Sequence, residues 1–255
     1  MSTANLAAPV VRWERQGRIA RIEFSSGSRN HFSTPLLAQL ADAFEQAERE
    51  PEVNAIVLCS RGRNFCAGAD LVDGQEEPAT LYAEAMRLFA IRKPIVAAVQ
   101  GAAIGGGLGL ALVADFRIVA PSSRLSANFV KLGIHPGFAM TYTLPRVVGP
   151  QRAAELFYTG RRLTGKEAHA IQLADRIVAE DQLLDAALEF ACAIAENAPL
   201  AVEATRSTLR MGLLEALKSR TEHEAAEQLR LRTTADFAEG IRAVTERRPG
   251  NWMRA

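Results

Sequence analysis

Two glycine-containing turns hold the residue types that could do chemistry. The first is SRGRNFCAGADL at residues 60–71, and the second is QGAAIGGGLGL at residues 100–110. Neither is a phosphate loop, because the pattern G-x-x-x-x-G-K-[ST] is absent. Such turns leave backbone N–H groups bare beside small side chains, and a helix beginning after Gly107 adds a positive partial charge. Close packing of strand and helix explains one such turn, but two in one chain indicate an oxyanion site.

These turns resemble the motifs of the crotonase, or enoyl-CoA hydratase/isomerase, superfamily. FCAGADL at 65–71 is similar to the first oxyanion-hole motif of that family, and KPIVAAVQGAAIGGGLGLALVADFRI at 93–118 is similar to the second. The resemblance covers nearly the whole chain. It extends to LGIHPG at 132–137, LPRVVG at 144–149, TGRRLTGKEAHAIQLADRIV at 159–178 and DFAEGIRAVTERRPG at 236–250.

The resemblance implies that the backbone N–H groups of Ala67 and Gly106 form an oxyanion hole. Two aligned donors in a dry pocket stabilise a thioester oxygen as it gains negative charge. The implied partner is an acyl-CoA thioester, with coenzyme A as part of the substrate and no prosthetic group. No metal site is expected, since the three cysteines show no Cys-x-x-Cys spacing.

The sequence departs from the hydratases of that family at two positions. They use one glutamate three residues after the middle glycine and another four residues before the glycine of L-G-x-x-P-G. Here these positions are Gly109 and Phe129. We therefore expect poor hydration of crotonyl-CoA and an enolate-based decarboxylase, hydrolase or atypical isomerase or lyase. The alternative is a catalytically inactive CoA-thioester-binding or scaffold protein of the same fold.

Few side chains could replace the missing glutamates. His135, in the loop at 133–137, is a tentative proton donor or acceptor, because its ordinary pKa suits proton transfer near neutrality. A surface or hydrogen-bonding role is the alternative for this histidine. Tyr82 and Glu84 follow the first turn and could fold over the thioester, but a solvated loop and helix start is the simpler interpretation.

The remaining expected site residues line the pocket or contact coenzyme A. Phe129 is expected to form an apolar wall, and Gly109 provides either pocket space or close packing. Arg247 or Arg248 of a neighbouring subunit is expected near the CoA phosphates. By resemblance, Gly137 belongs to the substrate pocket, and coenzyme A recognition falls on Arg29, His31, Ala67, Ala69, Asp70, Leu71 and Gly106.

The elements that must position these residues alternate between strands and helices in the first half. A hairpin is predicted at 10–13 and 18–24, then a helix at 34–50 with Thr34 as N-cap. The other predicted elements before residue 136 are strands at 53–60, 94–99 and 116–120, helices at 79–91 and 108–114, and a turn at 101–107.

After Pro136 almost every segment has helical periodicity. Helices are predicted at about 138–147, 150–159, 164–171, 181–197, 199–217, 220–231 and 233–247, with one strand at 176–179. The polar loop DGQEEP at 73–78 is the best candidate for a mobile lid.

The element order predicts an α/β fold. The resemblance implies a crotonase-like ββα-spiral core at 1–198, a C-terminal helical trimerisation module at 199–255, and a homotrimer or dimer of trimers. With 255 residues and a net charge of +1, the chain lacks the broad positive surface of a nucleic-acid-binding protein.

No membrane association is expected either. The uncharged stretch 94–114 has the length of a membrane span, but its five glycines and Gln100 indicate a strand, a turn and a short helix. The first ten residues lack the features of a secretory signal, so a cytoplasmic location is expected.

Overall fold

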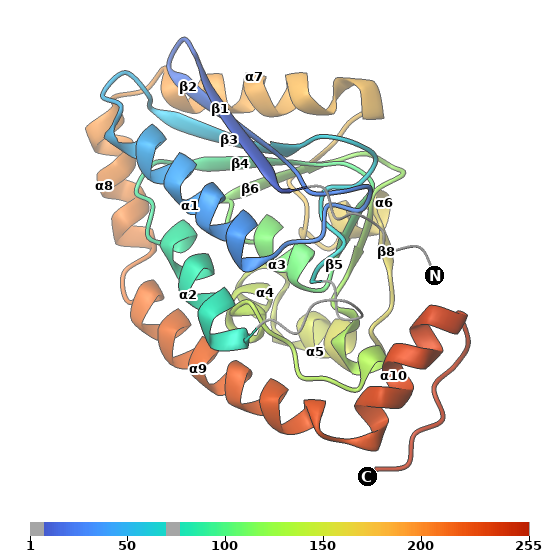
Figure 1. The fold of residues 1–255 in the computed structure, drawn as a ribbon. Coiled ribbons are helices and arrows are strands. Elements are labelled where there is room, and N and C mark those ends of the chain that lie inside the picture. The colour runs from blue at the N-terminus through green and yellow to red at the C-terminus, as the bar shows by residue number, and fades with distance from the viewer. Residues whose placement is uncertain (1–7, 70–76, 255) are drawn as a thin grey trace.

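The computed structural model describes residues 8–69 and 77–254 (Figure 1). Its main sheet has six strands in the order β1-β2-β3-β4-β6-β9. The first pair is antiparallel and all the others are parallel. The strands are β1 Val10–Gln16, β2 Ile19–Ser25, β3 Ala55–Ser60, β4 Ile95–Val99, β6 Phe116–Val119 and β9 Arg176–Ile177.

Helices cover both faces of this sheet, as Figure 1 shows. Side chains of β3 alternate between two apolar clusters: Ile56 and Leu58 lie in the cluster with helix α1, Thr34–Arg49. Val57 lies in the other cluster, with helix α7, Leu183–Ala195. A strand buried on both faces reads as a continuous apolar run, which explains why the sequence pattern located β3 and β4 well.

The structure contains a second, smaller sheet of three strands. It consists of β5 Ala102–Ile104, β7 Arg124–Ser126 and β8 Leu163–Thr164, in the order β5-β7-β8. The prediction of a turn at 101–107 was therefore wrong in part, and helix α3, Gly106–Ala111, begins earlier than predicted. Strands of two or three residues contain too little alternation to be recognised from the sequence.

Nearly all predicted helices are present, with shifted ends. Ser33, not Thr34, is the N-cap of α1, since its hydroxyl accepts a hydrogen bond from the Leu36 N–H at 3.3 Å. The other helices are α2 Pro78–Phe89, α4 Met140–Val148, α5 Pro150–Thr159, α6 Gly165–Ala170, α8 Pro199–Leu209, α9 Leu213–Arg232 and α10 Ala235–Glu246, with short 3-10 helices η1 Asn128–Leu132 and η2 Glu180–Gln182.

The last three helices run along one side and the base of the molecule (Figure 1). Leu217 and Ala225 of α9 belong to the same apolar cluster as α1 and α2. Leu200, Leu209 and Met211, on or just after α8, are strongly exposed. The division after residue 198 and the trimer stay predictions.

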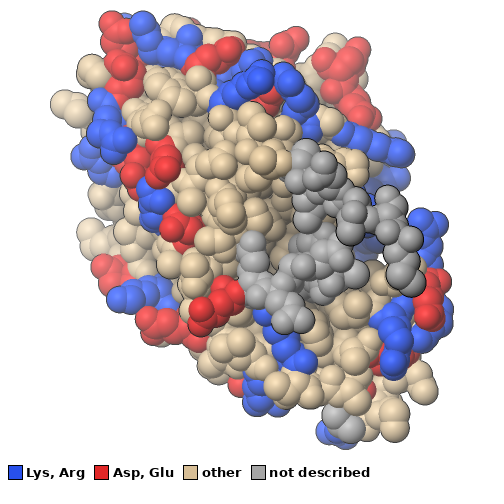
Figure 2. Space-filling model, in the orientation of Figure 1, with Lys and Arg blue, Asp and Glu red and all other residues tan. Residues whose placement is uncertain are grey.

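Charged side chains of both signs occur on the surface of the molecule. On the face drawn in Figure 2, acidic and basic side chains are interspersed around the edge. Within the described residues, no helix has the length and apolar character needed to cross a bilayer. Residues 94–114 instead form β4, β5 and α3, and they are largely buried in the core.

Candidate functional site

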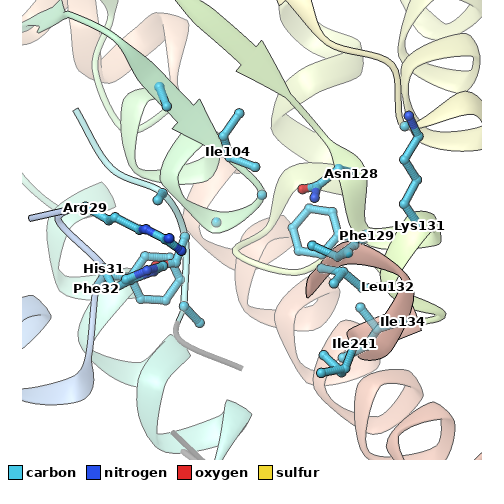
Figure 3. A pocket seen from close by; sticks show the side chains of 18 of the residues that line it. Arg29, His31, Phe32, Ile104, Asn128, Phe129, Lys131, Leu132, Ile134 and Ile241 are labelled. Atoms are coloured by element: carbon cyan, nitrogen blue, oxygen red, sulfur yellow. The ribbon is translucent and has the colours of Figure 1, made fainter. Parts of the chain in front are cut away.

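A cavity of about 1280 Å³ lies where the two glycine turns meet the C-terminal helices. In Figure 3, Arg29, His31 and Phe32 lie on one side of it, and Phe129 and Ile134 lie on the other. Backbone pairing brings the turns together, because Cys66 and Ala103 form a β-bridge. The bridge hydrogen bonds are Cys66 N–H to Ala102 O at 2.9 Å and Ile104 N–H to Cys66 O at 3.0 Å.

The Gly68–Ala69 peptide lines this cavity. Its carbonyl, that of Gly68, accepts a hydrogen bond from the Phe32 N–H at 3.1 Å. In a trans peptide the N–H points opposite to the carbonyl, so the Ala69 N–H points away from Phe32. Within the described part of the chain, no acceptor is found for the Ala69 N–H.

Ala67 is placed differently from its predicted role. It lines the cavity, but its N–H donates to the Arg29 carbonyl at 3.1 Å. The prediction of a free N–H at Ala67 was therefore wrong, because this donor already has a protein acceptor. Ala69, which was expected only to contact coenzyme A, lines the cavity and has an N–H without an acceptor within the described residues.

Gly106 lines the cavity at the first position of α3. Its N–H has no acceptor within the described residues. The turn needs glycine for steric reasons: a Cβ on Gly68 would lie 2.8 Å from the Ile104 carbonyl oxygen, and one on Gly106 would lie 2.4 Å from two ring atoms of Phe32. The close approaches of Gly68 to Ile104 and of Gly106 to Phe32 therefore require residues without a side chain at these two positions.

Gly109 and Phe129, at the two positions where the hydratases of the resembled family have glutamate, have different surroundings. Phe129 lines the cavity with only 8% of its surface exposed. Gly109 is absent from the described lining, and a Cβ there would lie 2.7 Å from the Phe138 Cβ. Of the two interpretations of Gly109, close packing is correct. Gly137 is also outside the described lining, and a Cβ on it would overlap the Tyr82 hydroxyl.

His135 does not reach the two amides. It is not among the described residues that line the cavity. Its Nδ1 lies 2.6 Å from the carbonyl oxygen of Pro136, and its ring is 6.0 Å from that of His223. The predicted proton-transfer role of His135 has no geometric support. Asp70, Leu71 and residues 73–76 of the predicted lid lie outside the described residues.

Tyr82 forms part of the inner wall, although the sequence analysis attributed it to a solvated helix start. It is 6% exposed and lines the cavity with Phe138 and Gln228. Its hydroxyl donates to Gln228 Oε1 at 2.9 Å, and Gln228 Nε2 donates to the His135 carbonyl at 2.9 Å. Burial, followed by the charge of Glu224, raises the pKa of Tyr82, so the phenol stays neutral.

Cations gather at the cavity although the chain is nearly neutral. No Asp or Glu is among its described lining residues. The described basic residues of the lining are Arg29, Arg124, Lys131, Arg161, Arg162, Arg232, Arg247 and Arg248. This arrangement favours a ligand with several negative charges.

Four of these cations are available to a ligand. Arg29, Lys131, Arg162 and Arg247 form no ion pair or side-chain hydrogen bond within the part of the chain that the structure describes. Arg124 also lacks an ion pair there, but its guanidinium donates to three backbone carbonyls. Arg247 and Arg248 line the cavity of their own chain. The expectation that one of them approaches the CoA phosphates from a neighbouring subunit stays a prediction. The described residues contain no group of His, Cys, Asp or Glu side chains suited to a metal ion.

Comparison with known proteins points to one family. The family model described as Enoyl-CoA hydratase/isomerase matches residues 14–255. A relative named "Probable enoyl-CoA hydratase echA14" from Mycobacterium tuberculosis is 39% identical over 213 residues, which cover 80% of this chain and 82% of the relative. The 2,3-dehydroadipyl-CoA hydratase of Escherichia coli is 32% identical, covering 92% of this chain and 94% of the relative.

Solved structures give the same result. The enoyl-CoA hydratase/isomerase from Pseudoalteromonas atlantica superposes with a TM-score of 0.86 at 27% identity, covering 95% of this chain and 99% of that one. An enoyl-CoA hydratase from Bacillus anthracis superposes with a TM-score of 0.75 at 31% identity, covering 95% and 98%.

Proposed function

Because the chain belongs to the enoyl-CoA hydratase/isomerase family, whose enzymes act on CoA thioesters, we propose that the Ala69 and Gly106 amides bind the thioester oxygen of an acyl-CoA. The observation that carries this proposal is the pair of N–H groups without acceptors, within the described residues, in a cavity lined by cations. As an enolate forms, negative charge develops on that oxygen. Donors already aimed at it stabilise the charge without reorganisation.

The apolar wall strengthens these hydrogen bonds. Phe32, Phe129 and Phe138 line the cavity, and each is at least nine-tenths buried. Such a wall keeps water away from the thioester, and electrostatic interactions are stronger in a region of low dielectric constant. The aromatic rings contribute no donor or acceptor of their own, so polarisation of the substrate depends on the two backbone amides.

The basic side chains of the cavity that form no ion pair bind the coenzyme A end of the substrate in this proposal. Coenzyme A carries several phosphate charges, and arginine binds phosphate oxygens through two parallel N–H donors. Arg29, Lys131 and Arg162 are exposed at the cavity. Figure 3 places Arg29 and Lys131 on opposite sides of it. We assign the CoA phosphates to this group.

The reaction differs from ordinary hydration in this proposal. Hydration needs groups that position and deprotonate water, but Gly109 is packed against Phe138, and Phe129 offers only a ring. Decarboxylation needs the polarised carbonyl and little further acid–base help, because loss of CO2 itself leaves the enolate. Thioester or C–C hydrolysis, or an atypical isomerase or lyase reaction, needs the polarised carbonyl together with a proton donor or acceptor.

A catalytically inactive CoA-thioester-binding protein is the second candidate. The observation that favours it is that no carboxylate lines the cavity among the described residues. Turnover separates the two candidates: a mass-spectrometric screen of diverse acyl-CoA esters should identify a converted substrate if the protein is an enzyme. Binding without conversion of any ester would favour the second candidate.

Removal of one phosphate-binding cation should weaken CoA binding. We expect Arg162→Ala to raise the Kd for an acyl-CoA about tenfold, since a hydrogen bond to a charged group contributes about 1.5 kcal/mol or more. Isothermal titration calorimetry measures this change. Arg152→Ala is the matched control, because Arg152 is exposed on α5 and does not line the cavity. Equal Kd values for the two variants would contradict the assignment of Arg162, and no binding of any acyl-CoA would contradict the proposed function.

A further inference from the structure

We propose that His31 is a positioning residue that holds the Gly68–Ala69 peptide so that its N–H points at the substrate oxygen. This inference rests on the proposed function of that amide. His31 lines the cavity and is partly buried. Its Nδ1 lies 3.1 Å from the Gly68 carbonyl oxygen.

The hydrogen bond fixes the tautomer of the imidazole. A carbonyl oxygen can only accept, so Nδ1 must carry the hydrogen. The Gly68 oxygen therefore receives two donors, His31 Nδ1–H and the Phe32 N–H, each at 3.1 Å. Both come from the chain segment on one side of the cavity, which Figure 3 shows with the His31 and Phe32 side chains close together.

These two donors control where the Ala69 N–H points. Carbonyl and N–H of one trans peptide are rigidly opposed, so fixing the Gly68 oxygen fixes the Ala69 N–H. Control is needed at this position because Gly68 has a φ of +86° and glycine has the widest choice of backbone conformations. Hydrogen bonds to the carbonyl also polarise the peptide and strengthen the donor at its other end.

The position of His31 is itself fixed by its neighbour Asn30. Asn30 is 2% exposed and adopts a left-handed φ of 52°. Its Nδ2 donates to the carbonyls of Arg61 and Asn64, each at 2.8 Å, and its Oδ1 accepts from the Ser26 N–H at 2.8 Å. The imidazole is thus presented by a rigid backbone, as a residue that orients another group requires.

A proton-transfer role for His31 would have a different experimental signature. The Nδ1 of this ring is bonded to the Gly68 carbonyl, so only Nε2 could exchange a proton with a substrate. Asparagine cannot transfer protons but can donate a hydrogen bond from Nδ2, which occupies nearly the place of Nδ1. Phenylalanine keeps the ring volume and removes the donor. His31→Asn and His31→Phe therefore separate positioning from proton transfer.

The experiment compares two ligands that differ only at the carbonyl: an acyl-CoA thioester and the corresponding S-alkyl-CoA thioether. We expect His31→Phe to weaken binding of the thioester about tenfold, the upper range for one hydrogen bond, and to leave binding of the thioether unchanged. His31→Asn should recover most of the loss. Isotope-edited infrared spectra of bound thioester should show a carbonyl band between the free and wild-type frequencies in His31→Phe, because the Gly106 N–H still donates, and a band at the lower, wild-type-like frequency in His31→Asn.

Each other result overturns the inference. Unchanged thioester binding and carbonyl frequency in His31→Phe would mean that Phe32 alone orients the peptide. Equal losses for thioester and thioether would mean that His31 contacts the CoA moiety. Loss of turnover in both variants with a wild-type carbonyl frequency would indicate proton transfer. Failure of the wild-type protein to bind either ligand would instead refute the proposed function, so the two failures are distinguishable.

Discussion

Gly106→Ala is expected to lower kcat/KM for the protein's acyl-CoA substrate by about 10²- to 10³-fold, the usual effect of losing one oxyanion donor. The N–H remains in this variant, but its position changes. An added Cβ would lie 2.4 Å from both Cε1 and Cζ of Phe32, so the ring or the turn must move. The Phe32 N–H also holds the Gly68 carbonyl, so a shift of Phe32 disturbs both donors of the hole.

A second substitution tests this steric explanation. Leucine lacks atoms corresponding to Cε1 and Cζ, so Gly106→Ala combined with Phe32→Leu should recover at least about tenfold of the lost kcat/KM, as coupled neighbours do. Phe32→Leu alone is the control for the loss of ring packing. The substrate is the ester found by the acyl-CoA screen, and far-ultraviolet circular dichroism verifies folding. Wild-type activity in Gly106→Ala, or an identical loss in the double variant, would contradict the explanation.

Glu224→Ala is expected to destabilise the protein by about 3 kcal/mol or more, because each buried donor left without an acceptor costs about 1–3 kcal/mol. Glu224, on α9, is fully buried. Its carboxylate accepts hydrogen bonds from the N–H groups of Ala139 at 2.8 Å and Thr141 at 3.0 Å, and from the Thr141 hydroxyl at 2.6 Å. These groups start α4, so alanine would leave three donors unsatisfied.

The stability that Glu224 provides depends on pH. Burial raises its pKa from 4.5 to about 7, although hydrogen bonds from Thr141 and Ala139 oppose this shift. Between pH 4.5 and about 7, the Glu224 carboxyl group is therefore protonated in the native state and ionised in the unfolded state. This contribution is fully present below pH 4.5 and is lost as pH rises through about 7, which lowers the unfolding free energy by up to about 3 kcal/mol.

Urea denaturation at several pH values checks both statements about Glu224. The difference between the wild-type protein and Glu224→Ala should shrink as pH rises from 4.5 to about 7, the window between the unfolded and native pKa values of Glu224. Glu222→Ala is the matched control, because Glu222 is exposed on the same helix and should change stability by less than about 0.5 kcal/mol. Equal effects of the two substitutions, or a difference independent of pH, would contradict the assignment.

Much of the fold could be predicted from the sequence. The mixed α/β class and the family resemblance are confirmed by the structure and by the family model. The hairpin at β1 and β2 and the buried strands β3 and β4 were located because alternation and continuous apolar runs are local signals. The strands β5, β7 and β8 were missed or misassigned because pairing with distant segments, not local composition, forms them.

The site could be predicted less completely. The glycine turns were identified, but choosing between Ala67 and Ala69 required knowing which amide the Arg29 carbonyl accepts, a contact 38 residues away in the chain. The sequence also contained no information on the direction of the His135 side chain, which does not line the cavity among the described residues. The cations of the cavity come from segments between residues 29 and 248, so only the folded chain brings them together.

The most direct test of the account compares binding and hydration of one ester, crotonyl-CoA. Calorimetry measures binding, and loss of the absorbance of the conjugated double bond measures hydration, with an active hydratase of the family as positive control. We expect saturable binding with hydration at least about 10³-fold slower than the control, since general acid–base catalysis contributes about 10²- to 10⁴-fold. Hydration at the rate of the control would contradict the claim that this protein polarises thioesters without the carboxylates of a hydratase.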